Sequence, residues 1–129
     1  MSVSQTPSAV LLIAHGSRRA EANHDLTELA AKLKASGRYA IVECSYLELA
    51  KPTISEGGRR CVEQGAESVL MLPYFLSAGT HVTADLEYDR LQLAAEYPAV
   101  VFQLCPPLGL HPLMTEIVLD RLREGSAQL

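Results

Sequence analysis

Short apolar segments alternate with longer amphipathic segments along the whole chain. Four apolar runs, rich in β-branched residues or leucine, predict strands at residues 9–14, 40–46, 68–72 and 100–104. Such near-continuous apolar character is typical of parallel strands that are covered on both faces. Residues 21–35 place Leu26, Leu29 and Leu33 on one helical face. Further helices are predicted at residues 53–64, 84–96 and 112–123, and the Gly57–Gly58 pair is expected to weaken the first of these three.

The predicted elements follow one another as strand and helix, repeated four times. Right-handed crossovers then favour a flavodoxin-like sheet with the strand order 2-1-3-4. The fold class that we predict is therefore α/β, a three-layer sandwich around a four-stranded parallel sheet. The chain of 129 residues is expected to form a single domain over residues 1–129, with residues 1–8 as a flexible N-terminus.

Composition and charge narrow the classes of partner. The net charge of −4 argues against nucleic acid or an anionic membrane as the main partner, but not against a small anionic ligand. No apolar run reaches the roughly 18 residues that span a bilayer, and the N-terminal segment lacks the features of a signal peptide. Cys44, Cys61 and Cys105 are widely spaced and odd in number, which predicts free thiols in a reducing compartment, by default the cytoplasm.

Three residues with metal-binding side chains recur at equal intervals. His15, Glu48 and His81 each come after a predicted strand, and 33 residues separate each from the next. Because the carboxyl ends of parallel strands meet at one edge of a sheet, we expect the three side chains to converge there. Two imidazoles and a carboxylate can ligate a divalent metal while leaving room for a substrate.

Each of these residues also has a structural interpretation. His15, followed by Gly16 and by Ser17 as the expected N-cap of the next helix, could merely hydrogen-bond a neighbouring loop. Glu48 could be a solvated loop residue, and His81 could stabilise a helix start. Lys51 is either a cationic contact for a carboxylate-bearing ligand or a lysine that faces solvent. Of the other histidines, we expect His24 at the surface, and we expect His111 to cap the fourth helix rather than assist the site.

The loop after the third predicted strand combines apolar, small and polar residues. Phe75 and Leu76 precede a Ser-Ala-Gly-Thr stretch that ends at His81. Such a loop suits a flat, partly apolar ligand with anionic edges. The alternative is that both apolar side chains pack beneath the loop.

Four segments together resemble the sirohydrochlorin cobaltochelatases, a class of metal-inserting enzymes that work without ATP. They are LLIAHGSRRAEAN, YLELAKPTI, QGAESVLMLPYFLSAGTHVTADL and PPLGLHP, and the resemblance extends over residues 9–123. It implies that His15, Glu48 and His81 are the metal ligands and catalytic residues. It also implies that the loop before His81 contacts the macrocycle. The substrate-binding residues are then Lys51, Phe75, Leu76, Ser77, Ala78, Gly79 and Thr80.

The resemblance implies a chelatase-like fold and the insertion of a divalent metal into sirohydrochlorin, as in cobalamin or siroheme biosynthesis. Cobalt is the first choice, with nickel and iron open; the metal is a substrate, and no permanently bound cofactor is expected. The length resembles the small form of the family, which pairs as a homodimer.

Two alternative functions stay open. One is a non-catalytic metal or tetrapyrrole carrier on the same fold. The other is a histidine phosphatase-like hydrolase, against which Ala14 stands in place of a phosphate-binding arginine.

Overall fold

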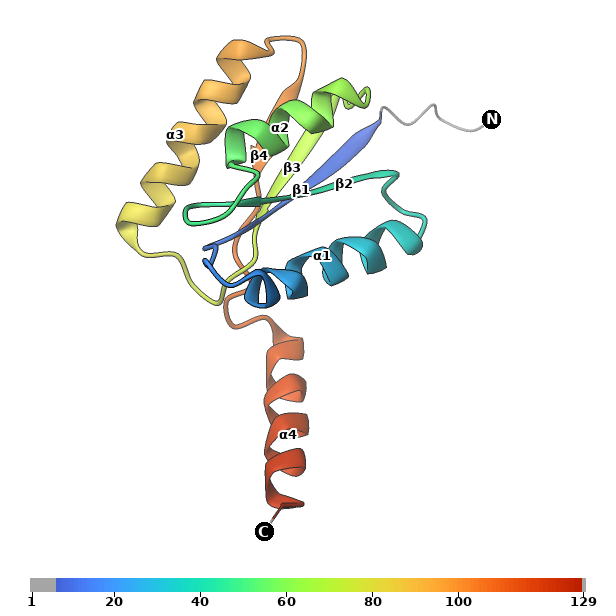
Figure 1. The fold of residues 1–129 in the computed structure, drawn as a ribbon, viewed down its shortest axis with the longest axis vertical. Helices are drawn as coiled ribbons and strands as arrows, with labels where there is room; N and C mark the ends of the chain where they lie inside the picture. Colours follow the sequence, from blue (N-terminus) through green and yellow to red (C-terminus); the bar gives the residue numbers. More distant parts are fainter. Residues whose placement is uncertain (1–6, 129) are drawn as a thin grey trace.

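A parallel sheet of four strands, in the order β2-β1-β3-β4, organises the computed structural model, which describes residues 7–128 (Figure 1). The strands are β1 (Ser8–Ala14), β2 (Ile41–Tyr46), β3 (Ser68–Pro73) and β4 (Val101–Leu104). The helices are α1 (Ala20–Ala35), α2 (Ile54–Glu63), α3 (Thr80–Glu96) and α4 (Pro112–Ser126). The predicted alternation, the α/β class and the strand order are confirmed. Within residues 7–128, no helix is both long and apolar enough to span a membrane.

The two faces of the sheet carry separate cores. On β1, Leu11 and Ile13 face one side and belong to the larger core beneath α2 and α3. Val10 and Leu12 face the other side and pack with Leu26 of α1. Because β1 is covered on both faces, it needs apolar residues at every position, as the continuous run in its sequence predicted.

Gly57 and Gly58 allow α2 to approach its neighbours closely. A Cβ atom at Gly57 would lie 2.7 Å from Cδ1 of Leu11, and one at Gly58 would lie 2.7 Å from both Cδ atoms of Leu93. The low helix propensity of the pair is offset by this packing and by a capping box, in which Thr53 and Glu56 bond each other's backbone amides. The glycines therefore have a packing role that the sequence analysis missed.

We expect Gly57→Ala to destabilise the protein by about 1–3 kcal/mol, although alanine favours helix by about 1 kcal/mol. The added methyl group would collide with Leu11, which is fully buried and cannot move into solvent. The unfolding midpoint in urea measures this effect. Gly125→Ala in α4 is the matched control, because nothing lies within 4 Å of its Cβ position. A Gly57→Ala midpoint equal to or above that of the unsubstituted protein would contradict the packing argument.

Helix α3 begins four residues earlier than predicted. Gly79 is its N-cap with extended backbone angles, and its carbonyl oxygen accepts a hydrogen bond from the Thr83 amide at 2.9 Å. Thr80 and His81 therefore lie in the first helical turn instead of in the preceding loop. The sequence did not indicate this start, because no side chain caps it.

Two smaller expectations also need correction. Ser17 is not the N-cap of α1; the N-cap is Arg19, and Ser17 is held in the preceding loop by two hydrogen bonds with the Asn23 side chain. The expected flexible N-terminus falls mainly on residues 1–6, which lie outside the described residues. Ser8 already belongs to β1, and the Pro7 carbonyl oxygen accepts a hydrogen bond from the Glu67 amide at 2.9 Å.

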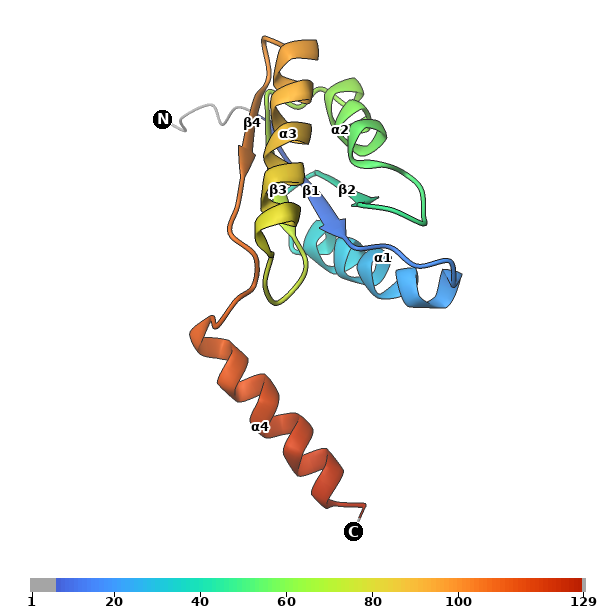
Figure 2. The same ribbon diagram turned by 90° about the vertical axis from the view of Figure 1, so that its left-hand side faces the viewer.

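Helix α4 departs from the three-layer arrangement. Helix α1 covers one face of the sheet and α2 with α3 cover the other, whereas α4 projects away from the body in both ribbon views (Figure 1, Figure 2). None of its residues is buried. His111 caps this helix, as expected: its Nδ1 accepts a hydrogen bond from the Leu113 amide at 3.1 Å.

Candidate functional site

Backbone hydrogen bonds join the two loops that carry His15 and Glu48. The Leu47 amide donates to the Ala14 carbonyl oxygen at 2.9 Å, and the Glu48 amide donates to the His15 carbonyl oxygen at 3.0 Å. The pairing of β1 with β2 thus continues past both strand ends. Gly16 permits this approach, since its φ is +97° and a Cβ atom there would lie 1.9 Å from the Glu48 carbonyl oxygen. The structure therefore confirms that His15 and Glu48 meet at the carboxyl edge of the sheet.

The His15 ring stacks on Phe75. The ring centroids are 4.5 Å apart and the planes are inclined by 31°. Phe75 is half-buried and packs against the larger core, whereas His15 itself is exposed. The imidazole is therefore supported on one side by an aromatic ring that is anchored in the core. Phe75 both packs beneath its loop and contacts a candidate site residue.

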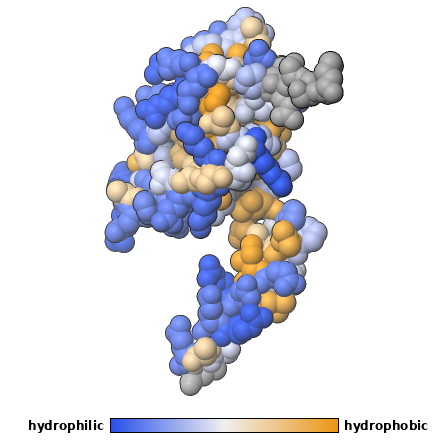
Figure 3. Space-filling view, turned by 90° about the vertical axis from the view of Figure 1, so that its right-hand side faces the viewer, coloured by the Kyte–Doolittle hydropathy of each residue, from blue (hydrophilic) through white to orange (hydrophobic). Residues whose placement is uncertain are grey.

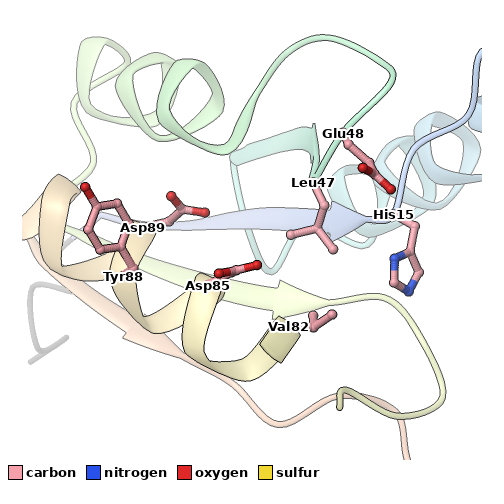
Figure 4. Close-up of a pocket in the computed structure, with 7 residues that line it drawn as sticks. All are labelled: His15, Leu47, Glu48, Val82, Asp85, Tyr88 and Asp89. Atoms are coloured by element: carbon pink, nitrogen blue, oxygen red, sulfur yellow. The ribbon is translucent and has the colours of Figure 1, made fainter. Parts of the chain in front are cut away.

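A pocket of about 420 Å³ opens beside these residues (Figure 4). We call it the edge pocket, and it is lined by His15, Leu47, Glu48, Val82, Asp85, Tyr88 and Asp89. Its walls come from the loops after β1 and β2 and from one face of α3. Figure 4 shows His15 and Glu48 at one end, Tyr88 and Asp89 at the other, and Asp85 between them. Imidazole and carboxylate groups that share an open pocket can bind a cation and accept protons.

Asp85 and Asp89 are members of the pocket that the sequence analysis missed. They lie one helical turn apart on α3, and His81, Asp85 and Asp89 recur at intervals of four residues. This spacing is the signal that could have found them, once the helix was known to begin at Thr80. Within residues 7–128, no ion pair involves either aspartate. The edge pocket therefore carries several negative charges, which favour a cation.

Burial raises the pKa of the Asp89 carboxyl above its ordinary value, and the negative charge of Asp85 raises it further. Because the folded state holds the Asp89 proton more tightly than the unfolded chain does, the ionised form lowers the folded state's stability at neutral pH. A cation bound beside Asp85 and Asp89 would stabilise the ionised carboxylates and so oppose the rise in the pKa of Asp89. Carboxyl groups with a pKa raised in this way are common at functional sites.

His81 is not part of the edge pocket. It is exposed in the first turn of α3, and its neighbour Val82 lines the pocket in its place. In the part of the chain that the structure describes, no three His, Cys, Asp or Glu side chains are grouped closely enough to hold a metal ion. The structure thus brings together His15 and Glu48 but leaves His81 apart, and shared ligation by all three stays a prediction.

None of the other predicted substrate contacts lines the edge pocket. Lys51 is exposed and lines a separate hollow with Cys44 and Arg60, between α1, β2 and α2. In the loop before α3, Leu76 is 61% exposed. Of the remaining loop residues, Ala78 is half-buried, and those that are exposed are Ser77, Gly79 and Thr80. His24 is exposed on α1, and its Nε2 lies 3.2 Å from Oε1 of Glu28.

Hydrogen bonds connect the loop before α3 with the segment that leads to α4. The Leu108 amide donates to the Phe75 carbonyl oxygen at 3.1 Å, and the Gly109 amide donates to the Leu76 carbonyl oxygen at 2.8 Å. The position of Phe75, and through it that of the His15 ring, is therefore coupled to the start of α4.

Comparison with known proteins finds related chelatases over most of the chain. The CbiX family matches residues 9–125. The chain is 36% identical over 114 residues to the chloroplastic sirohydrochlorin ferrochelatase of Arabidopsis thaliana, covering 88% of this chain and 51% of that protein. It is 27% identical to the sirohydrochlorin cobaltochelatase of Methanopyrus kandleri, covering 91% of this chain and 96% of that protein.

A solved structure gives the same picture of the fold. The sirohydrochlorin chelatase SirB from Bacillus subtilis subspecies spizizenii, in complex with cobalt, superposes with a TM-score of 0.83 at 29% identity. This match covers 91% of the present chain and 50% of that one. The chain spans between 40% and 51% of the length of the first curated relatives that it matches.

Proposed function

The chain belongs to the CbiX family, and on that premise we propose that it is an ATP-independent chelatase that inserts a divalent metal into sirohydrochlorin. The reaction would belong to cobalamin- or siroheme-type tetrapyrrole biosynthesis. Cobalt is the first choice of metal and nickel or iron the second; relatives named for cobalt and for iron both match the chain. The metal is a substrate, and no resident cofactor is proposed. The three cysteines are free thiols, in keeping with work in the cytoplasm.

The juxtaposition of His15 and Glu48 at an open pocket is the observation that carries this proposal. Metal insertion transfers an ion to four pyrrole nitrogens and releases two N–H protons. An exposed imidazole can bind the ion weakly and can accept a proton near neutral pH. The Glu48 carboxylate attracts the ion and offers a second proton acceptor at the same place. Asp85 and Asp89 extend the negative charge along α3 and would draw metal ions into the pocket.

The tetrapyrrole is proposed to lie over the loop before α3. The exposed Leu76 offers apolar contact for the macrocycle, and the residues from Ser77 to Thr80 offer polar groups beside it. His81, exposed in the first turn of α3, is proposed as a further metal ligand. Lys51 and the exposed Arg18 are proposed contacts for the carboxylates of the substrate.

A homodimer completes the proposal. The edge pocket, at about 420 Å³, is near the lower limit of pockets for small ligands, whereas a tetrapyrrole is a broad disc. A second chain facing the same edge would supply the missing wall. Twofold pairs are also the commonest oligomers.

Incubation of the full chain with sirohydrochlorin and Co²⁺ tests the function. A chelatase used at a tenth of the substrate concentration converts all of the sirohydrochlorin, which the absorbance spectrum follows. A carrier changes the spectrum only in proportion to the protein added. No rate above the protein-free control with cobalt, nickel or iron would refute the proposal.

We expect Glu48→Gln to lower the insertion rate by about 100-fold, because the amide keeps the shape of the side chain but loses its charge and basicity. The melting temperature should change little, since the Glu48 side chain is exposed. Glu67→Gln is the matched control: it removes the same charge from an exposed position at the opposite edge of the sheet. An unchanged rate constant for Glu48→Gln at saturating metal and tetrapyrrole would show that Glu48 has no catalytic role.

A further inference from the structure

The imidazole of His15 lacks the hydrogen-bonding partner that usually orients a histidine at a metal site. Metal-binding histidines commonly donate their second ring N–H to a carboxylate or a backbone carbonyl group, which fixes the direction of the ring. The ring of His24 lies beside a glutamate of α1, and that of His111 accepts a backbone amide. Within residues 7–128, by contrast, no hydrogen bond or ion pair holds the His15 ring, and its support is the contact with Phe75.

Two hollows flank His15, so its ring has room to turn. On the α3 side lies the edge pocket, which contains Glu48. On the α1 side, a second hollow of about 230 Å³ lies between the end of β1 and the first turns of α1, and it is lined by His15, Ser17, Asn23 and Tyr74 among others. A histidine side chain has three staggered χ1 orientations and a broad, two-fold range of χ2. A ring without support would therefore be divided among several orientations, of which only some direct a nitrogen toward a metal ion beside Glu48.

The pairing of β1 with β3 places Phe75 beside His15. The Tyr74 amide donates a hydrogen bond to the Ile13 carbonyl oxygen at 2.7 Å, so the pairing continues past the end of β3. The next residue, Phe75, lies against the imidazole with ring centroids 4.5 Å apart. Because Phe75 also packs against the larger core, the stack joins one anchored ring to one exposed ring.

The segment before α4 holds the backbone of Phe75 as well. The hydrogen bonds from the Leu108 and Gly109 amides, described above, fix the carbonyl groups of Phe75 and the next residue. The same segment leads into α4, where Figure 3 shows apolar side chains gathered on the part of the helix nearest the body; Leu113 and Ile117 there are 63% and 51% exposed. Because α4 is continuous with the support of Phe75, the variants described below are made in the full chain.

We propose that Phe75 is a positioning residue that holds the His15 imidazole in a single orientation at the edge pocket. A contact between two aromatic rings is strong enough to favour one orientation by about 3- to 10-fold. A stacked ring also leaves both imidazole nitrogens free for the metal and for a proton, whereas a carboxylate partner would occupy one of them. This role is separate from the macrocycle contact that the resemblance implied. The inference rests on the proposed function, because it takes the metal that His15 binds to be the substrate.

Three variants separate the orientation of His15 from the general packing of the core. Phe75→Leu keeps an apolar side chain but removes the flat ring, and Phe75→Tyr keeps the ring. Phe102→Leu is the matched control, because Phe102 is the only other phenylalanine of the chain and is 3% exposed in the same core. Far-UV circular dichroism shows whether each variant is folded, and the unfolding midpoint in urea compares the losses of packing.

Nuclear magnetic resonance of the metal-free protein measures the placement of the ring. The ring protons of His15 are identified by their absence in His15→Ala. Because they lie over the face of Phe75, we expect their chemical shifts to be upfield of those of the exposed His24. Phe75→Leu should return them to the His24 values, whereas Phe75→Tyr and Phe102→Leu should not. Equal shifts for the two histidines in the unsubstituted protein would overturn the inference.

Titration of the same samples with Co²⁺ measures the consequence for the metal. A ring that turns freely binds the ion only with the competent fraction of its orientations, so Phe75→Leu should raise the Kd for Co²⁺ by about 3- to 10-fold. Phe75→Tyr and Phe102→Leu should stay within about twofold of the unsubstituted protein. In the metallation assay, the KM for Co²⁺ should rise by the same factor in Phe75→Leu. The kcat at saturating Co²⁺ should change little, because the bound metal itself then holds the ring.

The Kd values and the metallation assay decide between the outcomes. An unchanged Kd in Phe75→Leu, an equal rise in Phe102→Leu, or no binding of Co²⁺ by the unsubstituted protein would overturn the positioning role. If no sample metallates sirohydrochlorin but the ring-proton shifts and the Kd values follow the expected pattern, the chelatase is refuted and the positioning role is supported. If all samples metallate it with the same KM and kcat, the positioning role is refuted and the chelatase is supported.

Discussion

Replacing His15 by alanine should lower the rate of metal insertion by at least 100-fold while the protein stays folded. The substitution removes a metal ligand and, in our proposal, the better placed of the two histidines for accepting a proton. His15 follows the rigid end of β1, and its ring is held against Phe75 at 4.5 Å. Because the side chain is exposed, its loss leaves no buried cavity. The initial rate of sirohydrochlorin metallation measures the effect, and far-UV circular dichroism checks the fold.

Three further variants test what the His15 ring contributes and whether His81 takes part. His15→Phe keeps an aromatic ring against Phe75 but has no nitrogen, so it should be as inactive as His15→Ala; an active His15→Phe would reduce His15 to a packing role. His24→Ala is the matched control, since His24 is an exposed histidine of α1 outside the edge pocket. His81→Ala should also lose activity, and its comparison with His15→Ala tests whether the exposed His81 takes part in turnover.

Gly16→Ala should both destabilise the protein and remove its activity. The new methyl group would lie 1.9 Å from the Glu48 carbonyl oxygen, so the loops that carry His15 and Glu48 would have to separate. The backbone there also has φ +97°, which alanine adopts only with strain. We expect a loss of about 2–4 kcal/mol in the free energy of unfolding, from the collision and the strain together. Denaturant unfolding and the metallation rate measure the two effects.

The control for Gly16→Ala separates backbone strain from collision. Gly37 also has a positive φ, +79°, but nothing lies within 4 Å of its Cβ position. Gly37→Ala should therefore cost only the strain, about 1 kcal/mol, and should leave the metallation rate unchanged. If the two variants unfold at the same denaturant concentration, the close approach of the two loops is not needed for stability.

Local pattern was enough to predict the framework of the site. The element order and the sheet order follow from apolar runs and from the hand of crossover connections, and both are confirmed. The meeting of His15 and Glu48 follows in turn, because neighbouring parallel strands end at a common edge. The cap formed by His111 was predictable because it depends only on residues close in sequence.

Contacts between distant segments determine the remaining features, and no local pattern encodes them. Asp85 and Asp89 line the edge pocket because α3 packs against the sheet with that face toward the pocket, whereas His81, in the first turn of the helix, does not line it. The packing role of Gly57 depends on the distance between α2 and Leu11. The direction of α4 depends on hydrogen bonds between two loops more than 30 residues apart in sequence. An amphipathic pattern specifies that a helix buries one face, but the partner of that face depends on the folded positions of all the other elements.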